Sequence, residues 1–214
     1  MNTIEIKNLN KKIKGAEVLK DINLHLEGGK VYGLKGKNGS GKTMLMRAVC
    51  GLILPTGGSI TINGEQLGKQ ISFPRSVGIL IENPSFIPGY TGLKNLSVLA
   101  AIQKRVGEDE IRETLEKIGL DPDDKRTYRK YSLGMKQRLG IAQAIMENQQ
   151  LLILDEPMNA LDKDAVEEMR KLFLSFKASG KTMLIVSHNE GDISTLCDEV
   201  YEFDGARIKR RENV

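Results

Sequence analysis

Gly36-Lys37-Asn38-Gly39-Ser40-Gly41-Lys42-Thr43 decides the fold of this chain, because these residues match the complete pattern G-x-x-x-x-G-K-T. The glycines let successive backbone N–H groups face an anion, and the positive end of a following helix adds to the attraction. In such a loop the lysine reaches the β and γ phosphates, and the threonine hydroxyl can bind Mg²⁺. The whole stretch is therefore a predicted nucleoside triphosphate site, with Lys42 as a catalytic contact and Thr43 as a metal ligand.

The flanking residues have the order that this loop requires. Lys30-Val31-Tyr32-Gly33-Leu34 reads as a short strand that enters the loop. Residues 43–50 read as a helix that ends at Gly51, a natural position for glycine after a helix. Strand, loop and helix together predict an α/β domain.

A second motif supplies carboxylates. Leu151-Leu152-Ile153-Leu154 predicts a strand buried on both faces of a parallel sheet, and Asp155-Glu156 follows at its carboxyl end, where open α/β sheets bind ligands. We expect Asp155 to hold Mg²⁺ through its water shell, and Glu156 to orient or deprotonate the attacking water.

A third motif, Tyr131-Ser132-Leu133-Gly134-Met135-Lys136-Gln137-Arg138, precedes a helical pattern and places Ser132 at an N-cap. It resembles the signature motif, LSGGQ, of ATP-binding cassette (ABC) ATPases. Ser132 and Gly134 occupy the serine and second glycine positions, whereas Leu133 replaces the first glycine. The resemblance implies that Ser132 and Gly134 bind nucleotide.

The resemblance extends along nearly the whole chain. Asn159-Ala160-Leu161-Asp162 is similar to the D-loop of the family, which implies a nucleotide contact by Asp162. His188 follows the apolar strand Met183-Leu184-Ile185-Val186 and resembles the switch histidine. Its place at the end of a strand favours a catalytic contact with the γ phosphate.

Two positions depart from the family pattern. Glu82 stands where the family usually has a glutamine, so it is either a metal ligand that adds negative charge or a solvated loop acid. Where the family stacks an aromatic ring on adenine, this chain offers only Ile13, so we expect modest selectivity for the base.

The expected fold is an α/β P-loop nucleoside triphosphatase with a mostly parallel core sheet, an antiparallel β subdomain and an inserted helical subdomain. Residues 1–30 and 57–81 show period-two segments that suggest the antiparallel part, with a turn at Asn63-Gly64. Residues of about 86–147 are helical in pattern. A closing hairpin is expected to turn at Asp204-Gly205. The whole chain, 1–214, is expected to be one ABC ATPase domain.

Composition fits a compact cytosolic enzyme of 214 residues, with 40% hydrophobic and 28% charged residues. The net charge of +4 comes with short basic runs, which suit a solvated face or an anionic membrane surface. Two cysteines are too few for a disulfide framework and are expected to be reduced. Neither a signal peptide nor a membrane-spanning run is recognisable.

The resemblance implies ATP and Mg²⁺ as cofactors, and a head-to-tail homodimer or heterodimer with another ABC ATPase. The leading interpretation is the ATP-hydrolysing subunit of a transporter, held at the inner face of the cell membrane by a separate permease that contacts residues 82–90. The stretches 81–86 and 131–139 also resemble ATPases of bacterial peptide-antibiotic (bacitracin or lantibiotic) exporters. The alternatives are a soluble ABC ATPase that acts on ribosomes or nucleic acid, although no nucleic acid is expected as a partner, and a small-molecule P-loop kinase.

Overall fold

The computed structural model describes residues 3–82 and 84–211. The strands are β1 (Ile4–Ile13), β2 (Ala16–Leu26), β3 (Val31–Lys35), β4 (Gly57–Ile62), β5 (Glu65–Gln66), β6 (Val77–Leu80), β7 (Leu151–Asp155), β8 (Thr182–Val186), β9 (Glu199–Asp204) and β10 (Arg207–Arg210). The helices are α1 (Lys42–Val49), α2 (Gly92–Gln103), α3 (Glu108–Lys117), α4 (Leu133–Ile145), α5 (Lys163–Ala178) and α6 (Glu190–Leu196), with a short 3-10 helix, η1 (Tyr128–Lys130).

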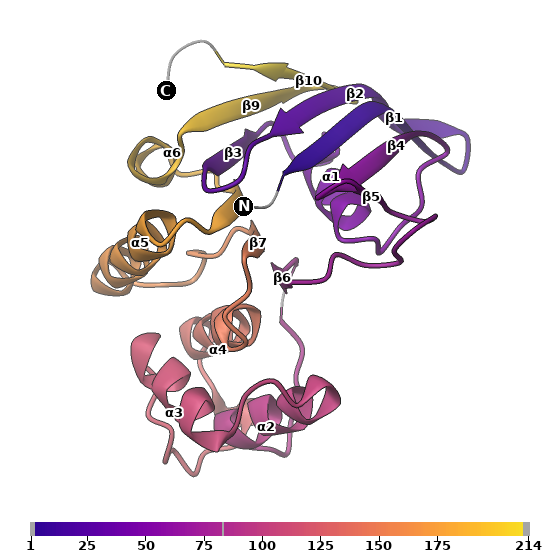
Figure 1. The fold of residues 1–214 in the computed structure, drawn as a ribbon. Helices are drawn as coiled ribbons and strands as arrows, with labels where there is room; N and C mark the ends of the chain where they lie inside the picture. The colour runs from indigo at the N-terminus through magenta and orange to yellow at the C-terminus, as the bar shows by residue number, and fades with distance from the viewer. Residues whose placement is uncertain (1–2, 83, 212–214) are drawn as a thin grey trace.

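The expected core sheet is confirmed and has the strand order β10-β9-β3-β8-β7-β6. All its neighbouring strands are parallel except β10, which pairs antiparallel with β9. The expected antiparallel sheet is also present, in the order β2-β1-β4-β5. The two sheets approach each other through β2 and β10, where the Lys20 N–H donates to the Ala206 carbonyl at 2.8 Å (Figure 1).

One expectation about the antiparallel sheet is wrong. Val77–Leu80, which we assigned to it, forms β6 and pairs in parallel with β7 in the core sheet. In an edge strand that is covered on one face, buried and exposed residues alternate, just as they do in an antiparallel strand. In β6 the residues Gly78 and Leu80 are buried and Val77 and Ile79 are half-buried, so the two-residue period alone could not assign the strand to one sheet.

The hairpin turns follow the glycines. Asn63 and Gly64 both have positive φ, 52° and 83°, as a type I′ turn requires, so the expected turn is confirmed. In the closing hairpin Asp204 pairs with Arg207, which places the loop at Gly205 and Ala206, one residue later than expected. Gly205 has a φ of 59°, and glycine at the first loop position is typical of a type II′ turn.

Residues 92–145 carry the helices α2, α3 and α4. Hydroxyl side chains start two of them: Thr91 accepts from the Lys94 N–H, and Ser132 accepts from the Met135 N–H. Such caps satisfy backbone donors that the first turn of a helix leaves free.

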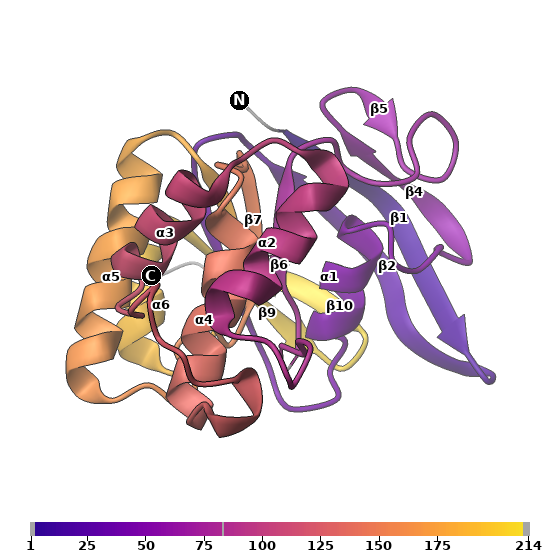
Figure 2. The ribbon, with the colours of Figure 1, turned by 90° about the horizontal axis from the view of Figure 1, so that it is seen from below.

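In Figure 1, α4 lies between the core sheet and the pair α2 and α3. Figure 2 shows β1, β2, β4 and β5 on the opposite side of the molecule from α5 and α6.

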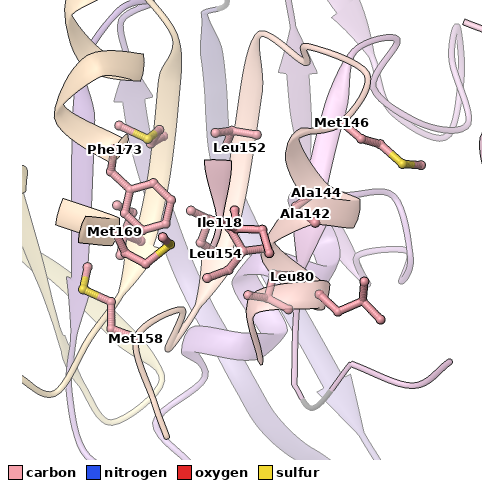
Figure 3. Close-up of a cluster of buried hydrophobic side chains, with 14 of the residues drawn as sticks. Leu80, Ile118, Ala142, Ala144, Met146, Leu152, Leu154, Met158, Met169 and Phe173 are labelled. Carbon is pink, nitrogen blue, oxygen red and sulfur yellow. The ribbon is translucent and has the colours of Figure 1, made fainter. Parts of the chain in front are cut away.

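Alternate residues of the central strands pack into two different hydrophobic clusters, one on each face of the core sheet. Leu151 and Ile153 join α1 and the antiparallel strands in one cluster. Leu152 and Leu154 face the other way and join the cluster that includes α4 and α5, where Met169 and Phe173 are also buried (Figure 3). Burying each leucine is worth about 1.5–3 kcal/mol before the entropy of ordering is deducted. The core therefore fixes both faces of β7, the strand that ends at Asp155.

The remaining expectations concern cysteine and the membrane. Cys50 and Cys197 are both free and buried. Within residues 3–82 and 84–211, none of the helices combines the length and the apolar character that crossing a bilayer demands.

Candidate nucleotide-binding and catalytic site

Three loops meet at the carboxyl edge of the core sheet. The strands β3, β8 and β7 are neighbours. The loops after β3 and β8 contribute residues 36–41 and 187–188, and the end of β7 with the residue after it contributes Asp155 and Glu156. A hollow of about 330 Å³ opens between these loops. Its lining residues are Val18, Asn38, Gly39, Ser40, Gly41, Lys42, Thr43, Met44, Asp155, Glu156, Val186 and His188.

The loop before α1 is closed around its own lysine. The Lys42 Nζ donates to the Gly36 carbonyl at 2.7 Å and to the Lys37 carbonyl at 3.0 Å. Burial lowers the pKa of Lys42, although the carboxylates of Asp155 and Glu156 oppose that shift. A buried ammonium whose hydrogen-bond partners, among the described residues, are two carbonyls is suited to an anionic ligand.

Gly41 lets the loop enter the helix. Its φ is 107°, and a Cβ at this position would lie 2.6 Å from the Val18 carbonyl oxygen, so both conformation and space exclude a side chain. The Ser40 Oγ, in the same loop, is buried and has no hydrogen-bond partner among the described residues. A phosphate oxygen beside the loop would supply that missing partner.

Thr43 and Asp155 bring two oxygen ligands together. The Thr43 Oγ1 donates to the Asp155 Oδ2 at 2.8 Å, and this bond joins α1 to the end of β7. The described residues contain no group of three or more His, Cys, Asp or Glu side chains that could hold a metal. Mg²⁺ commonly takes one or two protein oxygens and completes its shell with phosphate and water, so this pair fits that ion.

Glu156 combines burial with an unusual backbone. Its φ is 49°, and its N–H donates to the Val186 carbonyl at 3.0 Å. Burial raises the pKa of its carboxyl, against the attraction of His188. The His188 Nε2 lies 3.4 Å from Oε1, yet Oε1 has no hydrogen bond among the described residues. We read the contact as electrostatic, which leaves Oε1 free to accept a proton from water.

A buried network fixes the loop that carries His188. Arg170 on α5 donates to the Asp192 Oδ1 from Nε at 3.0 Å and from Nη2 at 2.5 Å. The Ser187 Oγ donates to the Asp192 Oδ2 at 2.9 Å and accepts from the Asn189 N–H at 3.1 Å. Asp192 is buried, whereas the His188 side chain is 55% exposed. The backbone beside His188 is thus anchored while its ring stays accessible.

The raised pKa of Glu156 predicts a pH-dependent difference between the wild type and Glu156→Gln. Above the ordinary value of 4.5, the unfolded chain loses this proton before the folded protein does. The wild type is therefore destabilised progressively as pH rises from the ordinary value through the folded pKa. We expect the nucleotide-free Glu156→Gln variant to have a larger free energy of unfolding than the wild type at pH 8. The difference between the two free energies should become smaller toward pH 5. Denaturant unfolding at both pH values measures it, and a gap that does not change with pH would contradict this explanation.

The remaining predicted site residues lie away from the hollow. Ser132 is exposed and caps α4, and the Asp162 Oδ1 caps α5 by accepting from the Ala165 N–H at 2.9 Å. Gly134 lies so close to the D-loop that a Cβ would be 2.9 Å from the Ala160 carbonyl oxygen. None of these three lines the hollow in this single chain. Their roles toward nucleotide stay predictions.

Ile13 and Glu82, the two departures, do not line the hollow either. Ile13 is 40% exposed at the tip of the β1–β2 hairpin, whereas Val18, which we did not predict, reaches the hollow. Glu82 has a φ of 62°, and its Oε1 accepts from the Arg47 Nη2 at 2.5 Å. Asn83, which belongs to the same predicted stretch, is outside the described residues. Val18 is an apolar residue three positions past the hairpin turn, and nothing in the sequence singled it out.

The chain is similar to known ATP-binding proteins along nearly its whole length. The model of the ABC transporter family matches residues 19–159. The uncharacterised ABC transporter ATP-binding protein YybJ of Bacillus subtilis is 48% identical, over 99% of this chain and 97% of that protein. The bacitracin transport ATP-binding protein BcrA of Enterococcus faecalis is 41% identical over 99% of this chain and 69% of that protein. The lantibiotic transport ATP-binding protein SrtF of Streptococcus pyogenes is 37% identical over 98% of this chain and 90% of that protein.

Solved structures agree with the fold. The ATP-binding cassette MJ0796, described as a dimer in a post-hydrolysis state with ADP and Pi, superposes with a TM-score of 0.87 at 21% identity, covering 99% of this chain and all of that one. An ATP-binding subunit of an ABC transporter superposes with a TM-score of 0.85 at 27% identity, covering 96% of this chain and 88% of the other. The expected fold class is thereby confirmed.

Proposed function

This chain belongs to the ABC transporter family of ATP-binding proteins, and we propose that it hydrolyses ATP to drive a separate membrane permease that exports peptide antibiotics. Within the family it is an ATPase that binds ATP and ADP. The observation that carries the catalytic part is the meeting of Lys42, Thr43, Asp155, Glu156 and His188 around one hollow. We propose that residues 1–214 form one ATPase domain with a helical insertion of about 86–147.

The proposed mechanism assigns one task to each side chain. Backbone N–H groups of residues 36–43 and the Lys42 ammonium hold the phosphates. The attacking water gives a proton to Glu156 as its oxygen bonds to the γ phosphorus, and the β–γ bridging oxygen leaves on ADP. Thr43 and Asp155 would hold Mg²⁺, which when bound neutralises phosphate charge. His188 donates to the γ phosphate across the edge of the hollow.

The separation of Ser132, Gly134 and Asp162 from the hollow supports a dimer. The N-terminus of α4 faces solvent, with Leu133 73% exposed, so its free backbone donors are available to an anion on another subunit. We propose that two cassettes pair head to tail, and that Ser132 and Gly134 of each cover the γ phosphate bound by its partner. The pair is either a homodimer or a heterodimer with another ABC ATPase.

A surface for the permease is proposed beside the Arg47–Glu82 ion pair. This pair ties α1 to the segment that leads into the helical insertion. Ile87 and Tyr90 are exposed on that segment, and Leu52 and Leu54 are exposed just after α1. Exposed apolar side chains bordered by polar groups, here the Arg47–Glu82 ion pair, are typical of docking surfaces. Through this contact the subunit would sit at the cytoplasmic face of the membrane, with no nucleic acid as a partner.

The type of cargo is proposed from relatives. Two of the curated proteins that resemble this chain are named for bacitracin and lantibiotic transport. A soluble ABC ATPase that acts on ribosomes or nucleic acid is not favoured by these similarities. A small-molecule kinase is less favoured still, because Glu156 lines the hollow beside Asp155 and His188, where we propose that it activates water.

Affinity purification of tagged Glu156→Gln from solubilised native membranes, in excess MgATP, tests this function. We expect a polytopic membrane protein to co-purify. Adding Ile87→Glu is expected to release that partner without loss of MgATP binding, because Ile87 lies outside the hollow. Leu174→Glu is the matched control, since Leu174 is an exposed leucine on α5. Recovery of only ribosomal or soluble companions would overturn the transporter proposal.

A further inference from the structure

Gln137 is a buried amide on α4 that faces the end of β7. Only 8% of the residue is exposed, and its Nε2 donates to the Glu156 carbonyl and to the Pro157 carbonyl, both at 3.0 Å. Both protons of one side-chain amide are therefore used on two successive peptide groups. The amide reaches from α4, the helix capped by Ser132, to the backbone that carries the proposed catalytic carboxylate.

The peptide that Gln137 holds is in a conformation that needs support. Glu156 has a φ of 49°, in the left-handed region that residues with a Cβ rarely occupy. Such strain persists where surrounding contacts over-determine it, and it gathers at functional sites. Here the Glu156 N–H is held by the Val186 carbonyl, and the Glu156 carbonyl accepts from Gln137 and from the Asn159 N–H. The Glu156 Oε2 accepts from the His188 N–H at 3.4 Å, and Gln137 fixes the backbone from which that side chain extends.

A second contact couples the same helix to the same loop. Gly134 lies one helical turn before Gln137, so the two residues share a face of α4. A Cβ on Gly134 would lie 2.9 Å from the Ala160 carbonyl oxygen, and Ala160 also has a positive φ, 63°. Residues 156–161 are thus held against the first turns of α4 at both ends. Movement of the N-terminus of α4 would be passed directly to Glu156.

We propose that Gln137 is a positioning residue for hydrolysis, which links the signature end of α4 to Glu156 of the same subunit. The proposal rests on the proposed function, in which Glu156 accepts the proton and the N-terminus of α4 contacts nucleotide on a partner subunit. When that N-terminus contacts nucleotide on the partner, it fixes the position of the Glu156 carboxylate in its own subunit. Nucleotide bound at one site would thereby affect hydrolysis at the other.

Gln137→Met tests the link, because methionine keeps the length of the side chain and removes both donors. We expect kcat for ATP hydrolysis to fall roughly 10- to 100-fold, as small misplacements of catalytic groups do. The Kd for MgATP should change by less than about 2-fold, since Lys42 and Thr43 are untouched, and the low-pH limb of the kcat profile should move. In the Glu156→Gln background the same change should cause no further loss. Gln143→Met on the same helix is the matched control and should leave kcat unchanged.

Each outcome decides the question. Gln137→Met with a lower melting temperature but an unchanged kcat and pH profile would reduce Gln137 to a structural contact and overturn the proposal. Additive losses in the double variant would also overturn it. If Gln137→Met does not fold, Gln137→Asn, which keeps the amide but withdraws it, should give an intermediate kcat, and a wild-type kcat would contradict the link. Failure of the underlying function is distinct, because then Glu156→Gln alone would hydrolyse ATP at the wild-type rate.

Discussion

Glu156→Gln is expected to lower kcat for ATP hydrolysis by at least about 100-fold, the loss typical for removal of a general base. The amide keeps the size of the carboxyl group but cannot take the proton from water. Binding should survive, because we assign the phosphate contacts to residues 36–43. The variant should therefore accumulate with ATP bound, and light scattering in excess MgATP should show twice the mass of one chain.

Glu147→Gln is the matched control for this result. Glu147 is a largely buried glutamate whose Oε2 lies 3.8 Å from Arg105 Nη1, and it follows α4 at the other end of β7. Its amide variant should hydrolyse ATP like the wild type and return to a monomer as ATP is consumed. A Glu156→Gln protein that stays monomeric in excess MgATP would contradict the two-subunit site, and one that hydrolyses normally would contradict the role of Glu156.

Lys42→Met is expected to remove most of the stabilisation that MgATP gives. Hydrogen bonds to charged groups contribute about 1.5–3 kcal/mol, so the Kd should rise roughly 10- to 100-fold. At 100 times the wild-type Kd, MgATP stabilises the wild type by about 2.7 kcal/mol, and the variant by roughly 0.4–1.4 kcal/mol. Thermal unfolding with and without MgATP measures the difference.

Lys181→Met separates this effect from the loss of a buried lysine. Lys181 is also buried, its pKa is also lowered by desolvation, and its Nζ donates to the Asn148 Oδ1 and the Gln149 carbonyl, both at 2.7 Å. It precedes β8 and so lies at the opposite edge of the core sheet. Both variants should melt below the wild type without nucleotide, but only Lys42→Met should lose the response to MgATP. An equal loss in both would contradict a direct contact.

Structural features that depend on a short continuous stretch of residues could be predicted from the sequence. The loop 36–43 and the strand that ends at Asp155 carry their own patterns, so the fold class followed from them. Strand pairing at the sheet edge did not, because Val77–Leu80 alternates in the same way in either sheet. Hairpin turns were predictable to within a residue, since glycine marks where φ becomes positive.

Contacts between distant segments were beyond the sequence. Val18 reaches the hollow only because β2 passes beside Gly41. Gln137 was read as part of the signature stretch, and nothing in its neighbours showed that it would bind the backbone of Glu156. Arg170 and Asp192 belong to different helices and meet only in the folded protein. Ile13 and Glu82 were placed by position in a motif, and the structure puts both outside the hollow.

The anchored backbone beside His188 has a consequence for speed. Because Ser187 donates to Asp192, which Arg170 holds in turn, we expect the imidazole to meet or leave a ligand by rotation of its side chain, without movement of the segment. Rotation of an exposed side chain takes picoseconds to nanoseconds, whereas loop and domain motions take up to milliseconds. Detection of the terminal phosphate by His188 would then never limit turnover, and the pace of the cycle would be set by the slower meeting and parting of whole subunits.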